Sequence, residues 1–456
     1  PGSPRCPAAE TEKRKNMKKN ILYIHTHDSG RFLEPFGVNV KTPNIMRLAQ
    51  EGTLFRQTYC AAPTCSPSRV GLLSGQAPHS THMLGLAQRG FQMDSYDSHL
   101  SNFLRGHGYH TCLFGVQHEA PVTDMLGYDY WFDEDCHHSR FIQRDTAASS
   151  HAAEYLLSYK EDKPFFMSVG FINTHRRYPE APADFVNPDY VMPPMTIPDT
   201  KENRKDMANF MYSAKIADDC VGTVLEALKK SGREDDTIII FTTDHGIAFP
   251  FMKCNCYDTG IGVTLIMKYK NNPSAGKVSD SLLSQIDIYP TLCDMLGLEK
   301  PEYLQGKSFV SLFDDTEKQI NDEIFAEVTY HAAYEPMRCI RTRRYKLIRY
   351  FDYHNSYVPA NIDGSPSKTE MIAAGLLKQT REREMLFDLE LDPLERKNLV
   401  NSPDYKEIYE ELRLHLEAWM ERTSDPLLGT GYRVPKPEGA WVNRLQDLDP
   451  ECTLSE

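Results

Sequence analysis

Residues 65–69, Cys-Ser-Pro-Ser-Arg, combine a nucleophile, a helix start and a cation. Ser66 is a favourable N-cap and Pro67 suits the first helical position, so the pattern predicts a helix that begins immediately after Cys65. The Cys65 thiol would then lie beside unpaired backbone N–H groups at the positive end of the helix dipole, where anions are favoured. Arg69, one turn further on, would add a planar cation that suits a tetrahedral oxyanion. These residues indicate group transfer from an anion; a small buried structural cysteine is the alternative interpretation.

Polar side chains follow four apolar runs, at the point where each predicted strand ends. The runs lie at residues 20–26, 109–114, 164–171 and 237–242. The polar residues at their ends are His27, Asp28, His118, His175, Arg176, Asp244 and His245. Open α/β sheets place their sites at the carboxyl ends of parallel strands, so we expect these side chains to share one site. Polar residues that are merely satisfied within a core are the alternative.

Asp28 and Asp244 follow two different strands, and each stands next to a histidine. Together with His27 and His245 they could hold one divalent metal, which would polarise a substrate oxygen and neutralise developing charge. The alternative is that the histidines only cap the strands. The repeated pairing of carboxylate and imidazole favours the metal.

The elements that must position these residues alternate between strands and helices. This alternation predicts an α/β fold, with a mainly parallel central sheet and helices on both faces. Helices are expected at residues 42–52, 98–106, 146–159 and 202–230, and an edge strand at 53–58. From residue 323 onward, short strands with tight connections predict a smaller α+β subdomain with an antiparallel sheet, closed by a helix at 404–421. The predicted divisions are a leader at 1–16, a catalytic domain at 17–322 and a C-terminal subdomain at 323–456, with an insertion at 352–384.

The composition of the chain argues against several classes of binding partner. The 456 residues carry a formal net charge of −13, which argues against nucleic acid. No apolar run approaches the length of a membrane-spanning helix, so we expect no membrane partner. Eleven cysteines without a CxxC pair do not indicate a zinc ribbon. Residues 1–16 lack an apolar signal-peptide core, so we expect a cytoplasmic location, or a secreted or periplasmic one if a signal was removed.

The cysteine pattern continues into Ser74-Gly75 and resembles the signature of the type I sulfatases of the alkaline-phosphatase superfamily. Five stretches in order extend the resemblance over nearly the whole chain, and they are most similar to the sulfamidase (heparan N-sulfatase) branch. They lie at residues 64–86, 164–176, 236–251, 335–351 and 386–400. In this family the cysteine, or a serine in some members, is oxidised after translation to formylglycine. The resemblance therefore implies that Cys65 is the precursor of an aldehyde hydrate nucleophile.

The resemblance also implies roles for the other residues. Asp28 and Asp244 correspond to calcium-ligating aspartates, and Arg69 to the residue that stabilises formylglycine and the sulfate. His175 corresponds to the sulfate-facing histidine, and His118 to the histidine that supports the nucleophile or the leaving oxygen. Lys253 corresponds to a basic sulfate ligand, and Arg176 to a residue that lies near the substrate in sulfamidases. In the implied mechanism one hydroxyl of the hydrate attacks sulfur, His118 or His175 protonates the leaving atom, and the second hydroxyl expels sulfate.

Two features depart from the family pattern. His27 stands where the family usually has aspartate, and His245 where it often has asparagine; nitrogen ligands make manganese, magnesium or zinc alternatives to calcium. Val116 stands where the motif has lysine. The cations that could replace that lysine are Arg31, Arg177, Lys253 and Arg338.

The resemblance implies a sulfate ester or sulfamate on an amino sugar from a glycosaminoglycan as substrate, and a formylglycine-generating maturation enzyme as partner. We expect a pocket lined by residues 180–198 and the C-terminal subdomain, with Arg31, His331 and Arg338 as further substrate contacts. An O-sulfatase acting on another sugar or an aryl sulfate, a phosphonate or phosphodiester hydrolase, and a non-catalytic sulfate-binding relative are the alternatives. The sequence leaves open whether the protein forms an oligomer.

Overall fold

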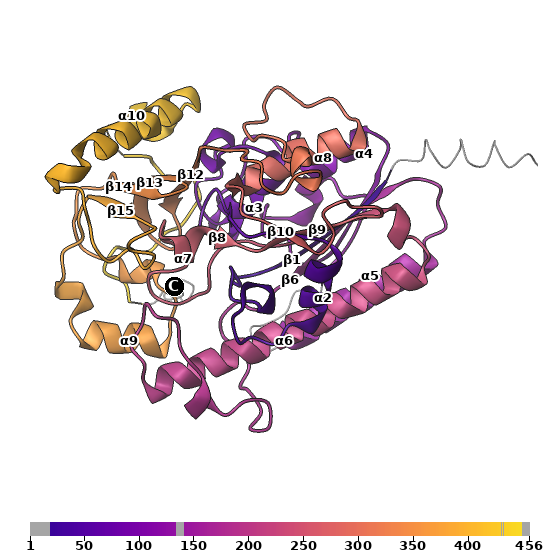
Figure 1. Cartoon of the computed structure of the whole chain (residues 1–456), viewed down its shortest axis with the longest axis horizontal. Coiled ribbons are helices and arrows are strands. Elements are labelled where there is room, and N and C mark those ends of the chain that lie inside the picture. The colour runs from indigo at the N-terminus through magenta and orange to yellow at the C-terminus, as the bar shows by residue number, and fades with distance from the viewer. Residues whose placement is uncertain (1–18, 134–140, 430, 432, 449–456) are drawn as a thin grey trace, which may run out of the picture.

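The computed structural model describes residues 19–133, 141–429, 431 and 433–448, so the predicted leader at 1–16 lies outside the described residues. An eight-stranded sheet forms the centre of the larger part (Figure 1). Its strands, in spatial order, are β10 (Lys277–Ser279), β2 (Thr53–Phe55), β9 (Leu265–Lys268), β7 (Thr237–Thr243), β1 (Asn20–Thr26), β6 (Phe165–Phe171), β4 (His110–Gly115) and β5 (Tyr130–Phe132). Only β9 runs antiparallel to its neighbours, so the predicted mainly parallel sheet is confirmed.

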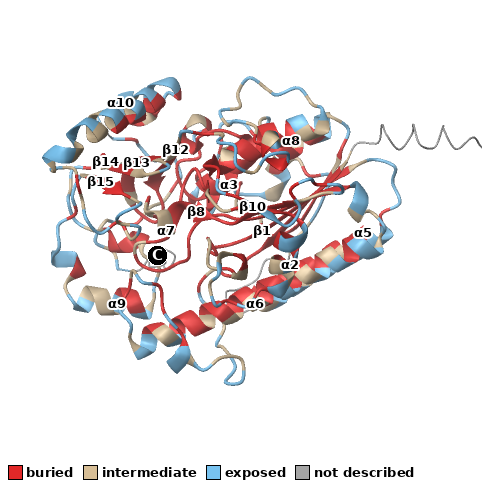
Figure 2. Cartoon of the chain, in the orientation of Figure 1, coloured by how far each residue is buried: buried red, intermediate tan, exposed pale blue. Residues whose placement is uncertain are grey.

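Helices cover both faces of this sheet, as predicted (Figure 1). On one face lie α2 (Pro43–Glu51), α5 (Phe141–Ser158) and α6 (Lys201–Lys230); on the other lie α3 (Cys65–Ser74), α4 (Leu100–Gly106) and α8 (Ile288–Leu296). The strand β1 shows why two cores form. Ile21 and Tyr23 pack into the core beneath α3 and α4, whereas Leu22 and Ile24 pack into the core beneath α2, α5 and α6. Because alternate residues of a strand face opposite sides, a strand that is apolar throughout is buried on both faces (Figure 2).

The C-terminal part forms a four-stranded antiparallel sheet, the smaller α+β unit that the sequence predicts. Its strands are β12 (Glu323–Tyr330), β13 (Tyr334–Thr342), β14 (Tyr345–Tyr350) and β15 (Glu384–Asp388). The helix α10 (Lys406–Arg422) packs on it, and α9 (Pro366–Ala373) lies in the segment predicted to be an insertion (Figure 1). The remaining elements are α7 (Asp258–Ile261), α11 (Pro426–Gly429) and a small sheet of β11 (Leu283–Ser284), β3 (Thr58–Tyr59) and β8 (Gly262–Val263). The division of the chain between residues 322 and 323 stays a prediction.

Two local predictions, on an edge strand and on the start of α3, are wrong, and a third, on α5, differs only in its bounds. Residues 53–58 do not form one edge strand, because the chain divides into β2, which lies inside the large sheet, and β3, which joins the small one. The helix expected at roughly 146–159 is confirmed as α5, which spans Phe141–Ser158. The helix expected after Cys65 begins at Cys65 itself, with Thr64 as the N-cap. Ser66 does not cap it, because its hydroxyl accepts a hydrogen bond from the backbone N–H of Ala87 at 2.9 Å.

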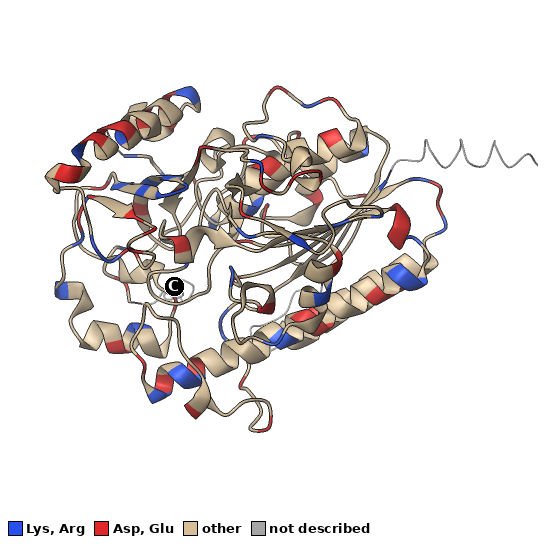
Figure 3. Cartoon of the chain, in the orientation of Figure 1, with Lys and Arg blue, Asp and Glu red and all other residues tan. Residues whose placement is uncertain are grey.

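Both charge signs are scattered over the outer helices, for example α6 and α10 (Figure 3). The net charge of −13 therefore does not describe the interior, where a few cations could still form an anion site. Among the residues that the structure describes, no helix is long and apolar enough to cross a bilayer.

Candidate active site

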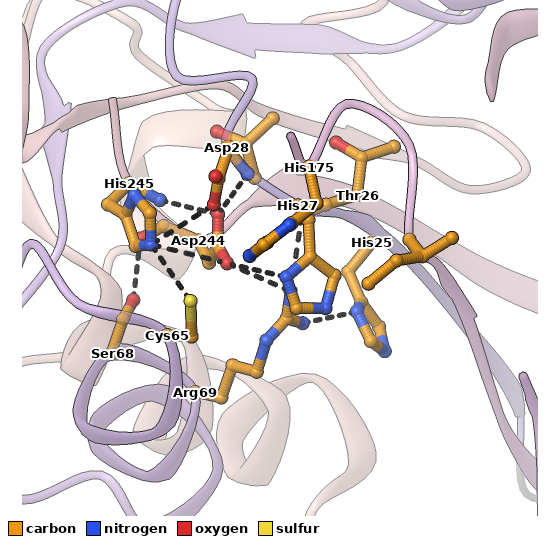
Figure 4. A network of polar contacts seen from close by, with 12 residues as sticks. His25, Thr26, His27, Asp28, Cys65, Ser68, Arg69, His175, Asp244 and His245 are labelled. Carbon is orange, nitrogen blue, oxygen red and sulfur yellow. Dashed lines mark hydrogen bonds and ion pairs between the residues drawn. The ribbon is translucent and has the colours of Figure 1, made fainter. Parts of the chain in front are cut away.

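The two histidine–aspartate pairs meet where β1 and β7 end. These strands pair in parallel with Thr26 opposite Thr243, so the residues that follow them emerge at the same edge of the sheet. His27 Nδ1 lies 3.5 Å from Asp244 Oδ2, and His245 Nε2 lies 3.4 Å from Asp28 Oδ1 and 3.6 Å from Asp244 Oδ2 (Figure 4). All four side chains are completely shielded from solvent. The structure thus brings the four predicted metal ligands together.

The donor atoms of this cluster fit a metal ion. Both ring nitrogens of His27 and Oδ1 of Asp28 are buried without a hydrogen-bond partner. His245 Nδ1 lies 2.9 Å from the carbonyl oxygen of Gly246, so it carries the proton and leaves the lone pair of Nε2 facing the cluster. Burial, and then Arg69, holds the pKa of His27 well below its ordinary value, so this imidazole is neutral and able to ligate. Unpaired buried carboxylate and imidazole atoms are costly unless an ion occupies their centre.

Adding a divalent metal is expected to stabilise the folded protein. At a concentration about 100-fold above the dissociation constant, the gain in unfolding free energy would be about 2.7 kcal/mol. Thermal unfolding with Ca²⁺, Mg²⁺, Mn²⁺ or Zn²⁺, against a sample treated with EDTA, measures it. Asp28→Asn should lose the shift, whereas Asp287→Asn, at a buried carboxylate outside the cluster, should keep it. An unchanged unfolding temperature with all four metals would contradict a metal site.

Cys65 lies against the metal cluster at the first turn of α3. Its sulfur is 3.4 Å from His245 Nε2, and one ligand atom from each of His27, Asp28, Asp244 and Cys65 lies within 4.8 Å of the others. Burial raises the pKa of the Cys65 thiol well above its usual range, and Asp28 and Asp244 raise it further against Lys253 and Arg69. The thiol is therefore protonated and, as it stands, a poor nucleophile.

Arg69 extends from α3 across the carboxyl end of β1. Its Nη2 donates to Asp244 Oδ2 at 2.9 Å, and its Nη1 donates to His25 Nδ1 at 2.5 Å (Figure 4). The sequence analysis missed His25, which lies within β1 and appears there as an interior strand residue. A side chain at Gly170 would bring its Cβ within 2.5 Å of His25 Cε1, so glycine on the neighbouring strand makes room for this ring.

His118 and His175 reach the cluster from the ends of β4 and β6. The ring centroids of His27 and His118 are 4.7 Å apart, and those of His27 and His175 are 5.9 Å apart. Two site residues adopt the left-handed backbone region that side chains disfavour, Asp28 with φ 44° and His118 with φ 59°. Strained backbone of this kind is typical of functional sites, because the surrounding structure must hold it.

Lys253 supplies a cation at the opposite side of the cluster. Its Nζ lies 2.9 Å from Asp28 Oδ2 and 3.0 Å from Asp363 Oδ2. Asp363 is a second residue that the sequence analysis missed, since it lies in the irregular segment assigned as an insertion. Val116 packs with Phe141 and Ile172 in a small apolar cluster, so the missing family lysine leaves no cation at that position.

His331 lies near the start of α3. Its Nδ1 is 3.3 Å from the hydroxyl oxygen of Thr64, the residue before Cys65. Arg31 points elsewhere: its Nη2 donates to the carbonyl of Thr58 at 2.9 Å, and its guanidinium lies 4.3 Å from the ring centroid of Tyr59. Substrate contacts by His331 and Arg31 stay predictions.

Two other residues that were predicted to contact the substrate, Arg176 and Arg338, form ion pairs within the protein. Arg176 forms a bidentate pair with Asp206 at 2.8 and 2.7 Å, and its Nε donates to the carbonyl of Ala248. Arg338 is completely buried, and its three guanidinium nitrogens donate to Asp425, Thr329 and backbone carbonyls. The prediction that Arg338 contacts substrate is therefore wrong. The recorded contacts use three of the five N–H groups of Arg176 and hold the segment after His175, and a substrate contact by Arg176 stays a prediction.

Arg338→Met is expected to lower the free energy of unfolding by about 3–5 kcal/mol, because it leaves buried carboxylates without their cation. Those carboxylates are Asp425, at 2.6 Å, and Glu327, at 3.2 Å. Denaturant titration measures the loss, and activity per folded molecule should not change. Arg204→Met is the control, because the side chains of Arg204 and its partner Asp199 are 34% and 49% exposed, and its loss should cost less than about 1 kcal/mol. Equal losses in the two variants would contradict the structural role of Arg338.

The chain is similar to known sulfatases over most of its length. Residues 13–298 match the sulfatase family model, and residues 244–375 match the model for the C-terminal part of N-sulphoglucosamine sulphohydrolase. An ulvan-active sulfatase of Formosa agariphila is 28% identical over 95% of this chain and 79% of that protein. N-sulphoglucosamine sulphohydrolase of Homo sapiens is 26% identical over 95% of this chain and 94% of that protein.

Solved structures show the same fold. One of them, a protein in complex with its substrate D-glucosamine-2-N,6-O-disulfate, has a TM-score of 0.64 and 19% identity over 90% of this chain and 98% of that chain. The family generally uses a divalent metal and formylglycine, and the described residues include a cluster able to hold a metal next to the signature cysteine. The family match over 13–298, on a site with this geometry, shows that the chain belongs to the sulfatase family and is a hydrolase of sulfuric esters or sulfamates.

Proposed function

We propose that this protein removes sulfate from an amino sugar derived from a glycosaminoglycan, using formylglycine formed from Cys65 and a divalent metal. The observation that carries the proposal is the convergence on Cys65. Its sulfur lies within 4.8 Å of ligand atoms of the metal cluster, and the cations Arg69 and Lys253 each pair with a carboxylate of that cluster. A tetrahedral sulfuryl group placed over residue 65 would therefore meet positive charge on several sides.

The unactivated Cys65 thiol supports the need for conversion to formylglycine. When formed, this residue would supply a hydrated aldehyde, with one hydroxyl to attack sulfur and a second to release sulfate. A maturation enzyme that generates formylglycine would be the partner for this step. A divalent metal, when bound by His27, Asp28, Asp244 and His245, would supply Lewis-acid polarisation of a sulfuryl oxygen. Calcium follows from the family, and manganese, magnesium and zinc are the alternatives. Among these, the nitrogen donors of the two histidines favour zinc most and magnesium least.

His118 and His175 would have different roles in proton transfer. Burial, and then Arg69 and His175, holds the pKa of His118 well below its ordinary value, so this imidazole is neutral, and its Nδ1 is buried without a recorded partner among the described residues. His175 Nδ1 donates to the carbonyl of Arg176 at 2.5 Å, which fixes the ring with Nε2 free. We assign the doubly protonated form of His175 as the acid that passes its Nε2 proton to the leaving nitrogen or oxygen, and His118 as the acceptor that orients the nucleophile.

The amino sugar is supported by the match of residues 244–375 to the C-terminal model of N-sulphoglucosamine sulphohydrolase. That region contains Asp244 and His245 of the metal cluster, and also Lys253 with its partner Asp363, and His331 beside the start of α3. The C-terminal sheet would therefore help to select the sugar, whereas the residues at the strand ends would carry out sulfate transfer.

The experiment that tests the proposal is a screen of sulfate release from N- and O-sulfated glucosamine and galactosamine. The protein should be co-expressed with a formylglycine-generating enzyme and loaded with metal. We expect turnover of at least one glucosamine derivative, with 4-nitrophenyl sulfate as a sugar-free comparison. Turnover of the aryl sulfate alone would contradict the amino sugar. Turnover of an aryl phosphonate without any sulfate release would contradict the proposed reaction.

A further inference from the structure

We propose that Asp363 determines specificity by accepting a hydrogen bond from a hydroxyl or ammonium group of the substrate, close to the sulfated atom. This inference rests on the proposed function and deepens it. No predicted role was attached to Asp363, because it lies between Asn361 and α9 in a segment without regular structure. Tertiary contacts alone place Asp363 beside Lys253.

Asp363 forms the outer end of a line of charges that starts at the metal cluster. Asp28 Oδ2 is 2.9 Å from Lys253 Nζ, which is 3.0 Å from Asp363 Oδ2. Exposure of the side chains rises along this line, from 0% for Asp28 through 4% for Lys253 to 14% for Asp363. Asp363 is therefore the most solvent-exposed member of this line.

The chain around Asp363 holds its carboxylate in place. Asn361 accepts a hydrogen bond from the backbone N–H of Ala333 at 2.8 Å and donates to Glu335 at 2.9 Å. Lys368 Nζ donates to the carbonyl of Ile362 at 2.6 Å. These contacts tie the segment to the turn between β12 and β13, close to His331. A carboxylate fixed in this way loses little conformational freedom when it binds a ligand, as recognition of a small polar group requires.

The carboxylate is charged and has accepting capacity left. Burial alone would raise the pKa of Asp363, but Lys253, His175 and His331 outweigh it and hold that pKa below its ordinary value. Lys253 binds Oδ2, and among the described residues no donor is recorded for Oδ1. A carboxylate has about four lone-pair positions on two oxygens, so Asp363 can accept further hydrogen bonds.

A negative group at this position cannot serve to bind sulfate, which it repels. It fits the part of the substrate that carries donors: a ring hydroxyl or an ammonium group beside the scissile bond. The same charge would reject a sugar with a second sulfate or a carboxylate at that place. Positioning Lys253 through their ion pair is the alternative role for Asp363. Loss of that role would weaken sulfate binding, whereas loss of a contact to the sugar would not.

The test compares the binding of D-glucosamine and inorganic sulfate to metal-loaded full-length protein by titration calorimetry or saturation-transfer NMR. In Asp363→Asn, D-glucosamine should bind about 10- to 100-fold more weakly, the range for a hydrogen bond to a charged group. Inorganic sulfate should bind at least as tightly as before, because a negative charge near Lys253 has been removed. Retained sulfate binding also shows that the variant is folded. Glu382→Gln removes an exposed carboxylate from the same segment and should change neither constant.

Weaker sulfate binding in Asp363→Asn would overturn the inference, since Asp363 would then act through Lys253. Unchanged glucosamine binding in the variant, or no glucosamine binding by the wild-type protein, would also overturn it. Failure of the proposed function is a separate result. A wild-type protein that binds glucosamine through Asp363 but releases no sulfate from any sugar would contradict the proposed reaction and leave this recognition in place.

Discussion

Replacing Cys65 with alanine is expected to abolish sulfate release, with a fall in kcat on the order of 10⁴-fold or more, the scale on which loss of a covalent nucleophile acts. The metal cluster, Arg69 and Lys253 would still bind sulfate, because none of them depends on the Cys65 side chain for its contacts. The variant should therefore retain affinity for inorganic sulfate while losing turnover. This separation of binding from chemistry distinguishes a nucleophile from a residue that only packs in the site.

Mass spectrometry of the tryptic peptide that spans residue 65 measures the conversion directly. The active sample should contain the lighter aldehyde form, and activity should rise in proportion to its fraction. Cys60→Ala is the matched control, because Cys60 is an equally buried cysteine in an apolar cluster. It should retain activity per folded molecule. An active Cys65→Ala enzyme, or full activity with an unmodified thiol, would contradict the mechanism.

The large sheet could be predicted because its central strands are buried on both faces. The runs that became β1, β6 and β7 are mostly apolar and buried at every residue, a pattern that is typical of strands covered on both faces. Asp28 and Asp244 follow two of these strands, so the parallel arrangement alone brings them to one edge. The same pattern, buried strands followed by polar residues, therefore predicts both the fold and the metal cluster.

The parts that sequence reasoning missed depend on contacts between distant segments. Asp363 meets Lys253 across 110 residues, and no periodic pattern marks its irregular segment. Arg338 is one of two arginines in its strand, and only its pairing with Asp425, 87 residues later, distinguishes it as buried. The start of α3 was misplaced because Ala87 engages Ser66, the expected N-cap, through a tertiary hydrogen bond. Local preferences cannot anticipate such partners.

Asp244→Asn is expected to lower kcat/KM by about 10³-fold, since one substitution removes both a metal ligand and the anchor of Arg69. Asp244 Oδ1 accepts from the backbone N–H of Asp28 at 2.8 Å and of His245 at 2.9 Å, and Oδ2 accepts from Arg69 at 2.9 Å. If the asparagine oxygen keeps the two backbone bonds, its NH₂ group faces the guanidinium, donor against donor. If the amide turns round, the backbone N–H groups lose their acceptor. Neither orientation of the asparagine amide satisfies both the backbone N–H groups and the guanidinium of Arg69.

Two measurements separate this effect from a general loss of stability. The variant should lose the metal-dependent rise in unfolding temperature, and its kcat/KM should be compared per folded molecule. Asp287→Asn is the matched control: Asp287 is equally buried and accepts from the backbone N–H groups of Ser284 and Lys307, but it lies outside the site. That control should lose stability and keep both activity and metal response. An Asp244→Asn enzyme with metal response intact and kcat/KM within tenfold of the wild type would show that Asp244 neither binds the metal nor positions Arg69 for the reaction.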